Sequence, residues 1–152
     1  MKIIAHRGLV SGPSDLENTP EQILSALDLG FDCEIDLRVI DDSFYLGHDY
    51  AQYKIDYKFL ETPGLWIHAK NFTAMEWLSK TDLVYFWHQE DDCALTSNRY
   101  VWIYPGKPLL KNSIAVMPEK CNYTSEDLRK CFAICTDYSH AYQVKFNEEN
   151  LD

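Results

Sequence analysis

Eight short apolar runs, separated by polar and turn-forming residues, limit how this chain of 152 residues can fold. Runs of this length bounded by turn formers are typical of buried strands. The runs cover residues 3–5, 31–35, 44–46, 65–67, 83–87, 100–104, 114–117 and 132–135.

Helical patterns lie between some of these runs. The clearest spans 19–29, where Pro20 sits in the first turn, Ile23, Leu24 and Leu27 share one face, and Gly30 follows the end. Weaker helices are predicted at 73–80 and 125–132.

Strands that alternate with helices predict a parallel sheet, and eight such strands predict an α/β fold of the (β/α)₈ (TIM) barrel type. Barrels of this type typically need ~250 residues, so we expect a compact form in which several outer helices are shortened or missing. No repeat or linker divides the sequence, and residues 1–152 are therefore expected to form a single domain.

Charge and hydropathy exclude several classes of partner. The formal net charge of −10, from 24 acidic and 14 basic residues, argues against binding to nucleic acid or to an anionic lipid surface. Apolar windows are too short to span a bilayer, and the chain begins directly with a predicted strand. We therefore expect a cytoplasmic protein without membrane insertion.

Glu34 and Asp36 are two residues apart in a predicted strand, so their carboxylates point to the same side while Ile35 points to the other. Two neighbouring carboxylates repel one another unless a cation, a proton or solvent relieves the repulsion. Phe31 to Leu37 otherwise resembles the wall of a core, which favours a buried pair that holds a divalent cation.

Three further polar segments are candidates to meet this pair at the carboxyl ends of the strands. They are His6-Arg7-Gly8, Glu17-Asn18-Thr19 and Gly47-His48-Asp49. If Asp36 and His48 lie at the same end, residues 37–43 must form an extended return, with a turn at 41–43.

Phosphodiester cleavage gives these residues sensible roles. A cation held by Glu34 and Asp36 would clamp the phosphate, and Arg7 would add a forked contact to its oxygens. His6 and His48 are predicted to be the general acid and base, because histidine exchanges protons near neutral pH. Each residue also has a purely structural alternative, as a surface acid, a core histidine or a turn residue.

The order and spacing of four motifs resemble the glycerophosphodiester phosphodiesterase family, whose fold is a (β/α)₈ barrel. The motifs are His6-Arg7-Gly8, Glu17-Asn18-Thr19, Glu34-x-Asp36 and His48-Asp49, with Lys70 and Thr136-Asp137-Tyr138 as weaker matches. The resemblance implies metal-dependent hydrolysis of a small phosphodiester through His6 and His48. It also implies that Arg7, Lys70, Glu17 and Asn18 bind the phosphate or line the mouth of the site, although Glu17 and Asn18 are equally well explained as residues that precede and cap a helix.

His68 departs from the family pattern, which usually has a third metal-binding carboxylate at this position. The resemblance implies Mg²⁺ or Ca²⁺, whereas an imidazole ligand at His68 would also suit Mn²⁺ or Zn²⁺. His88, at the end of the next strand, is a candidate additional ligand. The usual insertion after the third strand is absent, so the substrate's alcohol stays open, as does the oligomeric state.

Two other functions compete with this hypothesis. In one, the chemistry has been lost with the change at position 68, and Arg7 and Lys70 form an anion-binding module. In the other, the protein resembles phospholipase C-like or sphingomyelinase D-like barrels and acts on a different phosphodiester.

Overall fold

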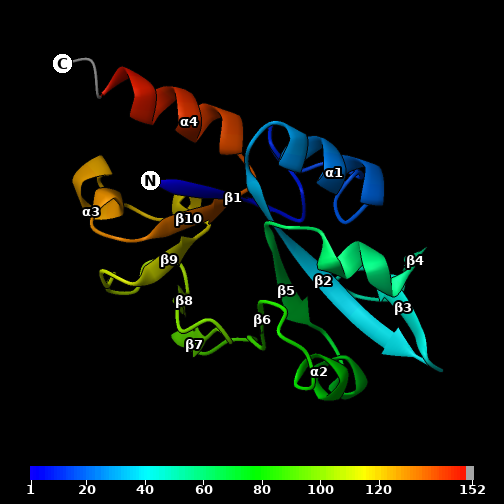
Figure 1. Cartoon of the computed structure of the whole chain (residues 1–152). Coiled ribbons are helices and arrows are strands. Elements are labelled where there is room, and N and C mark those ends of the chain that lie inside the picture. Colours follow the sequence, from blue (N-terminus) through cyan, green and yellow to red (C-terminus); the bar gives the residue numbers. More distant parts are fainter. Residues whose placement is uncertain (150–152) are drawn as a thin grey trace.

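The computed structural model describes residues 1–149, which form a ten-stranded mixed sheet with four short α-helices and two 3₁₀ turns (Figure 1). The strands are β1 (Lys2–His6), β2 (Asp32–Ile40), β3 (Ser43–Leu46), β4 (Tyr53–Ile55), β5 (Leu65–Ala69), β6 (Tyr85–Phe86), β7 (Cys93–Leu95), β8 (Val101–Ile103), β9 (Ser113–Val116) and β10 (Ala133–Thr136). The helices are α1 (Pro20–Asp28), α2 (Phe72–Leu78), α3 (Ser125–Arg129) and α4 (Ser139–Glu148), and the 3₁₀ turns are η1 (Tyr57–Glu61) and η2 (Pro118–Lys120).

Parallel pairing runs through the strands in the order β6-β5-β2-β1-β10-β9-β8. β7 pairs antiparallel with β8, and the β3-β4 hairpin pairs antiparallel with the second half of β2. The strands curl into a half-barrel with the helices on its outside (Figure 1). Within residues 1–149 no strand pair joins β6 to β8, although the rings of Phe86 and Trp102 stack with their centroids 4.3 Å apart.

The predicted (β/α)₈ TIM barrel is therefore wrong, even though each of the eight apolar runs contributes to a strand. α1, α2 and α3 connect parallel strands, but the connections after β6 and β8 contain no α-helix in the described chain. Three strands, β3, β4 and β7, run antiparallel to their neighbours. Without helices in these connections, the chain cannot form the outer ring of helices that such a barrel requires.

The predicted extended return at 37–43 is also wrong, because β2 continues to Ile40 and pairs antiparallel with β3, although the turn predicted at 41–43 is found at Asp41 and Asp42. Asp41 and Asp42, the two residues between the strands, have positive φ values of 47° and 58°. Positive φ at both central residues is the condition for a type I′ hairpin turn, and Asp tolerates this conformation better than most residues. The third apolar run therefore forms an antiparallel hairpin strand and not a barrel strand.

The helix predicted at 19–29 is confirmed as α1. The Thr19 side chain caps it by accepting a hydrogen bond from the Gln22 N–H, and Pro20 occupies the first turn. Ile23 is buried, whereas Leu24, predicted on the same face, is 43% exposed. The weaker helices are found as α2 and α3, both shorter than predicted.

Two apolar layers flank the curled sheet. The outer layer packs strand residues against α1, α2 and η1, and Ile35 and Leu37 of β2 share one buried cluster with Ile23 and Leu60. The inner layer fills the concave side with large rings, including Trp66, Phe86 and Trp102. The concave side thus has an apolar floor, and the polar site described below lies further along the same strands.

We predict that Trp102→Ala destabilises the fold by ~3–5 kcal/mol, because it removes a buried ring from the inner layer and leaves a cavity. Urea denaturation followed by circular dichroism measures the change in the free energy of unfolding. Leu95→Ala, at a side chain that is 68% exposed, is the control and should change stability by less than ~0.5 kcal/mol. Similar midpoints for the two variants would contradict this account of the core.

Candidate functional site

Glu34 and Asp36 lie on the concave side of β2, with side chains that are almost completely buried. The strand register sets Glu34 beside Trp66, Asp36 beside His68, and His6 beside Glu34. The alternation of side chains predicted from the sequence therefore places both carboxylates on the inner face, above the apolar floor.

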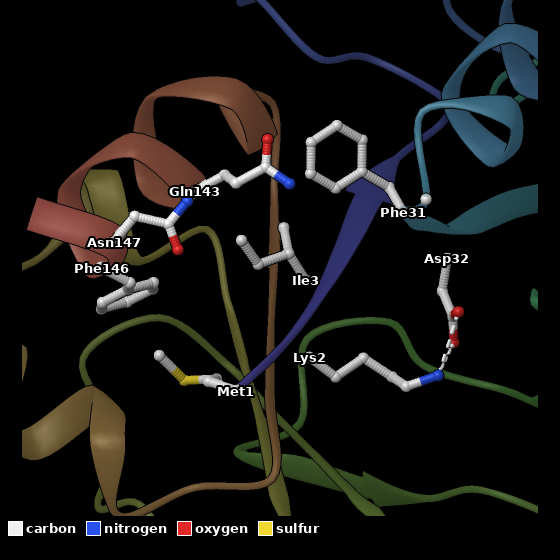
Figure 2. A pocket seen from close by; sticks show the side chains of 9 residues that line it. Met1, Lys2, Ile3, Phe31, Asp32, Gln143, Phe146 and Asn147 are labelled. Carbon is white, nitrogen blue, oxygen red and sulfur yellow. Dashed lines mark hydrogen bonds and ion pairs between the residues drawn. The ribbon is translucent and has the colours of Figure 1, made fainter. Parts of the chain in front are cut away.

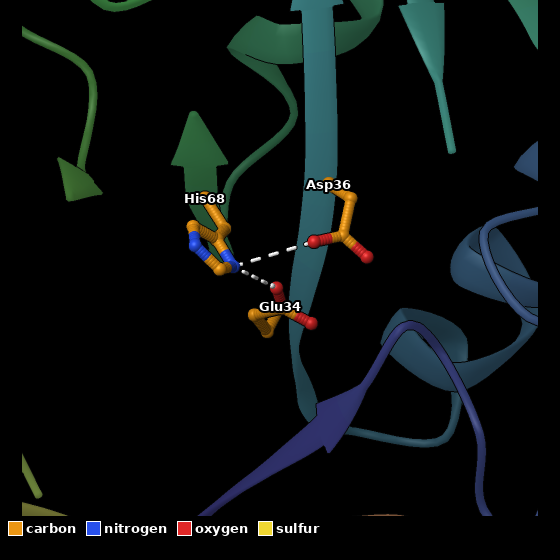
Figure 3. A group of neighbouring side chains, drawn as sticks. All are labelled: Glu34, Asp36 and His68. Atoms are coloured by element: carbon orange, nitrogen blue, oxygen red, sulfur yellow. Dashed lines mark ion pairs between the residues drawn. The ribbon is translucent and has the colours of Figure 1, made fainter. Parts of the chain in front are cut away.

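Glu34, Asp36 and His68 form a tight cluster in which one donor atom of each residue lies within 4.8 Å of the others. His68 Nδ1 is 3.3 Å from Asp36 Oδ1 and 3.5 Å from Glu34 Oε1, and Figure 3 shows the ring and the two carboxylates converging from β5 and β2. The three residues predicted as metal ligands are thus brought together.

Arg7 ties the loop after β1 to these acids. Its backbone N–H donates to Glu34 Oε2 at 3.1 Å, its Nη1 donates to Glu17 Oε2 at 2.9 Å, and its Nε lies 3.1 Å from Asp36 Oδ2. Arg7 has a positive φ of 53°. The loop accepts this unfavourable backbone conformation, and in it Arg7 contacts three carboxylates.

Asn18 is completely buried and binds Asp36 twice. Its Nδ2 donates to Asp36 Oδ2 at 2.8 Å, and its Oδ1 accepts from the Asp36 backbone N–H at 3.0 Å. The helix-capping alternative does not hold for Asn18, because Thr19 caps α1. Asn18 instead fixes the orientation of Asp36 through these two hydrogen bonds, and Glu17 fixes that of Arg7.

Burial and neighbouring charges shift the pKa values of Asp36 and His68 in opposite directions. Burial raises the pKa of Asp36, but the nearby ring of His68, the charge of Arg7 and the hydrogen bond from Asn18 outweigh it and hold that pKa below its usual value. For His68, burial lowers the pKa, but the effect of Asp36 and Glu34 is larger and raises the pKa to about 9.

His6 is held by a residue to which the sequence analysis gave no role. Its Nδ1 lies 2.7 Å from Asp137 Oδ1, while its Nε2 lies 3.9 Å from Glu34 Oε2. Burial lowers the pKa of His6, but the hydrogen bond to Asp137 and the charge of Glu34 outweigh it, so that pKa is raised above 6.5. Glu119 in turn accepts a hydrogen bond from the backbone N–H of Asp137 at 3.2 Å.

His48 follows β3 and is more exposed than His6. Its Nδ1 lies 2.8 Å from Asp49 Oδ1, and its backbone carbonyl accepts a hydrogen bond from Arg38 Nη2 at 2.5 Å. Gly47 precedes it with a φ of 149°, and a Cβ there would approach the Tyr50 carbonyl oxygen to 2.1 Å. A glycine is therefore required for the turn that presents His48.

A cavity of about 240 Å³ connects these groups. Five of the predicted site residues line it: His6, Arg7, Glu34, His48 and His68. Lys70 lines a neighbouring cavity of about 690 Å³, which His48 and His68 also border. Asp36, which is completely buried, lines neither cavity. Glu17 and Asn18 are not among the lining residues of either cavity.

His88 borders both cavities, yet it does not join the metal cluster. Its backbone carbonyl lies 2.8 Å from His68 Nε2, and its own Nε2 lies 2.8 Å from the Asp91 carbonyl. His88 therefore positions His68 through its main chain.

Another cavity, of about 290 Å³, lies at the N-terminal ends of β1 and β2, beside α4 (Figure 2). Its charged pair, Lys2 and Asp32, is an ion pair of 2.9 Å, and Asp32 also accepts from Trp66 Nε1. The remaining lining is apolar or amide, so this cavity offers no comparable set of acid, base and metal-ligating groups.

The chain matches no protein-family model, no curated protein and no solved structure. The resemblance to glycerophosphodiester phosphodiesterases therefore rests on the motifs alone. None of the helices within residues 1–149 is long and apolar enough to cross a membrane.

We predict that Asn18→Ala destabilises the protein by ~1–3 kcal/mol, because it leaves the buried Asp36 N–H without a partner and removes a donor from the carboxylate. Thermal and urea denaturation measure the loss. Asn112→Ala is the matched control, since its amide makes one long hydrogen bond at the surface. Equal stability of Asn18→Ala and the parent would contradict the role given to Asn18.

Proposed function

We propose that this protein is a divalent-cation-dependent phosphodiesterase that hydrolyses a small glycerophosphodiester-like substrate, with His6 and His48 as general acid and base. The observation that carries the proposal is the common cavity of these two histidines, which they share with Arg7, Glu34 and His68. The four sequence motifs that resemble the glycerophosphodiester phosphodiesterase family supply independent support.

Both histidines are oriented in the same way. Each has its Nδ1 next to a carboxylate, Asp137 for His6 and Asp49 for His48, at 2.7 and 2.8 Å. Such a partner fixes the ring and its tautomer, so that Nε2 is left for proton transfer. One imidazole would take the proton from the attacking hydroxyl, which belongs to the substrate or to water, and the other would protonate the leaving alkoxide.

Two cationic side chains support binding of a phosphate. Arg7 lines the cavity and is held in place by Glu17 and Asp36. Within residues 1–149 the ammonium of Lys70 makes no hydrogen bond or ion pair, and its charge acts on nearby Asp49. Both cations would offset the negative charge of the phosphodiester.

Glu34, Asp36 and His68 are the residues that would hold the cation. The cluster fits such an ion because Asp36 Oδ1 is buried without a hydrogen-bond partner. A bound divalent cation would stabilise the charge that develops on the phosphate oxygens.

The central test is hydrolysis of glycerophosphodiesters by protein that has been stripped of metal and resupplied with Mg²⁺, Ca²⁺, Mn²⁺ or Zn²⁺. We expect release of the alcohol with at least one ion, and a loss of about 10²-fold or more in kcat for His6→Ala and for His48→Ala. His140→Ala is the control, because His140 is an exposed histidine on α4. The proposal fails if no ion restores turnover and His6→Ala behaves as the parent does.

Asp137→Asn tests the orientation of His6. Loss of the carboxylate removes contributions that raise the pKa of His6, so the limb of the pH–rate profile that belongs to His6 should move to lower pH, and kcat should fall. Stability must be checked in parallel, with Asp28→Asn on the surface of α1 as the control. An unchanged pH profile would argue that Asp137 does not act through His6.

A non-catalytic anion-binding module is the second candidate, favoured by Lys70, which lines the larger cavity and whose ammonium has no ion-pair partner within residues 1–149. It predicts that the protein binds inorganic phosphate without turnover, and that Lys70→Ala weakens this binding.

A further inference from the structure

We infer that the cluster of Glu34, Asp36 and His68 selects a first-row transition-metal ion, with Zn²⁺ bound more tightly than Mn²⁺ and both more tightly than Mg²⁺ or Ca²⁺. The inference deepens the proposed function by naming the class of ion at the same site. It depends on three features of the cluster: the type of its donors, the orientation of its imidazole and an unpartnered carboxylate oxygen.

The donors come from adjacent strands that hold them at short range. Asp36 and His68 are register partners on β2 and β5, and Glu34 lies two residues before Asp36 on the same face. Strands in a sheet are more rigid than loops, so the mutual positions of the three side chains are set by the backbone. The atoms lie within 4.8 Å of one another, which is a separation that a single ion can bridge (Figure 3).

The imidazole of His68 is oriented as a ligand. Its Nε2 faces the backbone carbonyl of His88 at 2.8 Å, and a carbonyl can only accept, so Nε2 carries a hydrogen. A metal ion that replaces the proton on Nδ1 would then meet a lone pair directed toward Glu34 and Asp36. Metal-ligating histidines almost always donate their second ring N–H to such an acceptor.

Asp36 supplies a second and independent observation. Its side chain is 0% exposed, and its Oδ2 accepts from Asn18 and faces Arg7. Its Oδ1, which faces the cluster, has no hydrogen-bond partner, although His68 Nδ1 lies 3.3 Å away. A buried carboxylate oxygen without a partner is costly, and an ion between Oδ1 and Nδ1 would satisfy it.

The donor set determines the choice of ion. Mg²⁺ and Ca²⁺ prefer oxygen donors only, whereas imidazole nitrogen favours the later first-row ions. For a given site with nitrogen and oxygen donors, affinity rises from Mn²⁺ toward Zn²⁺. One nitrogen and two carboxylates also leave coordination positions open toward the cavity, as a catalytic zinc site requires.

Isothermal titration calorimetry of the chelator-treated protein with Zn²⁺, Mn²⁺, Mg²⁺ and Ca²⁺ tests the order of affinities. Because Zn²⁺ also binds thiolates, the titrations use a Cys93→Ser background, Cys93 being the exposed thiol of the chain. The visible spectrum of the Co²⁺-loaded protein gives a readout that does not depend on turnover, since it changes with the ligand set.

Three variants assign the ligands. His68→Ala should weaken Zn²⁺ binding by about 100-fold or more, since loss of an outer-shell partner alone costs ~10–100-fold. His68→Glu should reverse the preference in favour of Mg²⁺ or Ca²⁺ and change the Co²⁺ spectrum. His88→Ala keeps the backbone carbonyl that orients His68 and should leave Zn²⁺ affinity within a few-fold, as should His140→Ala.

The inference is overturned if Mg²⁺ or Ca²⁺ binds as tightly as Zn²⁺, if no ion binds, or if His68→Ala keeps the parent's Zn²⁺ affinity. Its failure can be told from failure of the proposed function. Tight Zn²⁺ binding through His68 without hydrolysis would overturn the phosphodiesterase and leave the metal site. Hydrolysis that needs Mg²⁺ and is unaffected by His68→Ala would overturn the transition-metal site and leave the phosphodiesterase.

Discussion

The buried pair of carboxylates on β2 is the constraint on which the rest of the site depends. Glu34 and Asp36 are 1% and 0% exposed and point to the same side of one strand. Buried charges of like sign are stable only when partners neutralise and hydrogen-bond them. Arg7 and Asn18 do so from the segment between β1 and α1, at two residues that both have positive φ. The backbone conformation of this segment therefore positions the two side chains that neutralise and hydrogen-bond the acids.

On the concave side, the apolar inner layer and the candidate functional site lie at different positions along the strands. Trp66 precedes His68 by two residues on β5, so both side chains face inward, and their register partners on β2 are Glu34 and Asp36. Trp66 packs in the inner apolar layer, whereas His68 contacts the acids. The indole N–H of Trp66 donates instead to Asp32 at the start of β2. A shift of two residues along β5 therefore leads from the apolar inner layer to the polar candidate site.

The sequence allowed eight of the ten strands and α1 to be predicted, because apolar runs and helix caps act locally. It did not allow the TIM barrel to be excluded, because an apolar run does not indicate whether its strand lies parallel or antiparallel to the neighbouring strands. The direction of β3 is decided by the turn at Asp41 and Asp42, whose aspartates carry no apolar signal. Antiparallel pairing there uses the edge of β2 beyond its pairing with β1, so β3 extends the sheet without becoming part of a barrel wall.

The acids and histidines of the site could be predicted from the sequence, whereas the groups that orient them could not. Two acids at i and i+2 reveal a shared face by strand geometry alone. Asp137 meets His6 across 131 residues of sequence, so only the fold brings the two together. His68 is oriented by a main-chain carbonyl, which every residue possesses and which no side-chain pattern can reveal. Residue types therefore indicate which chemistry a chain can perform, while the tautomer of an imidazole is set by backbone positions that only the folded structure defines.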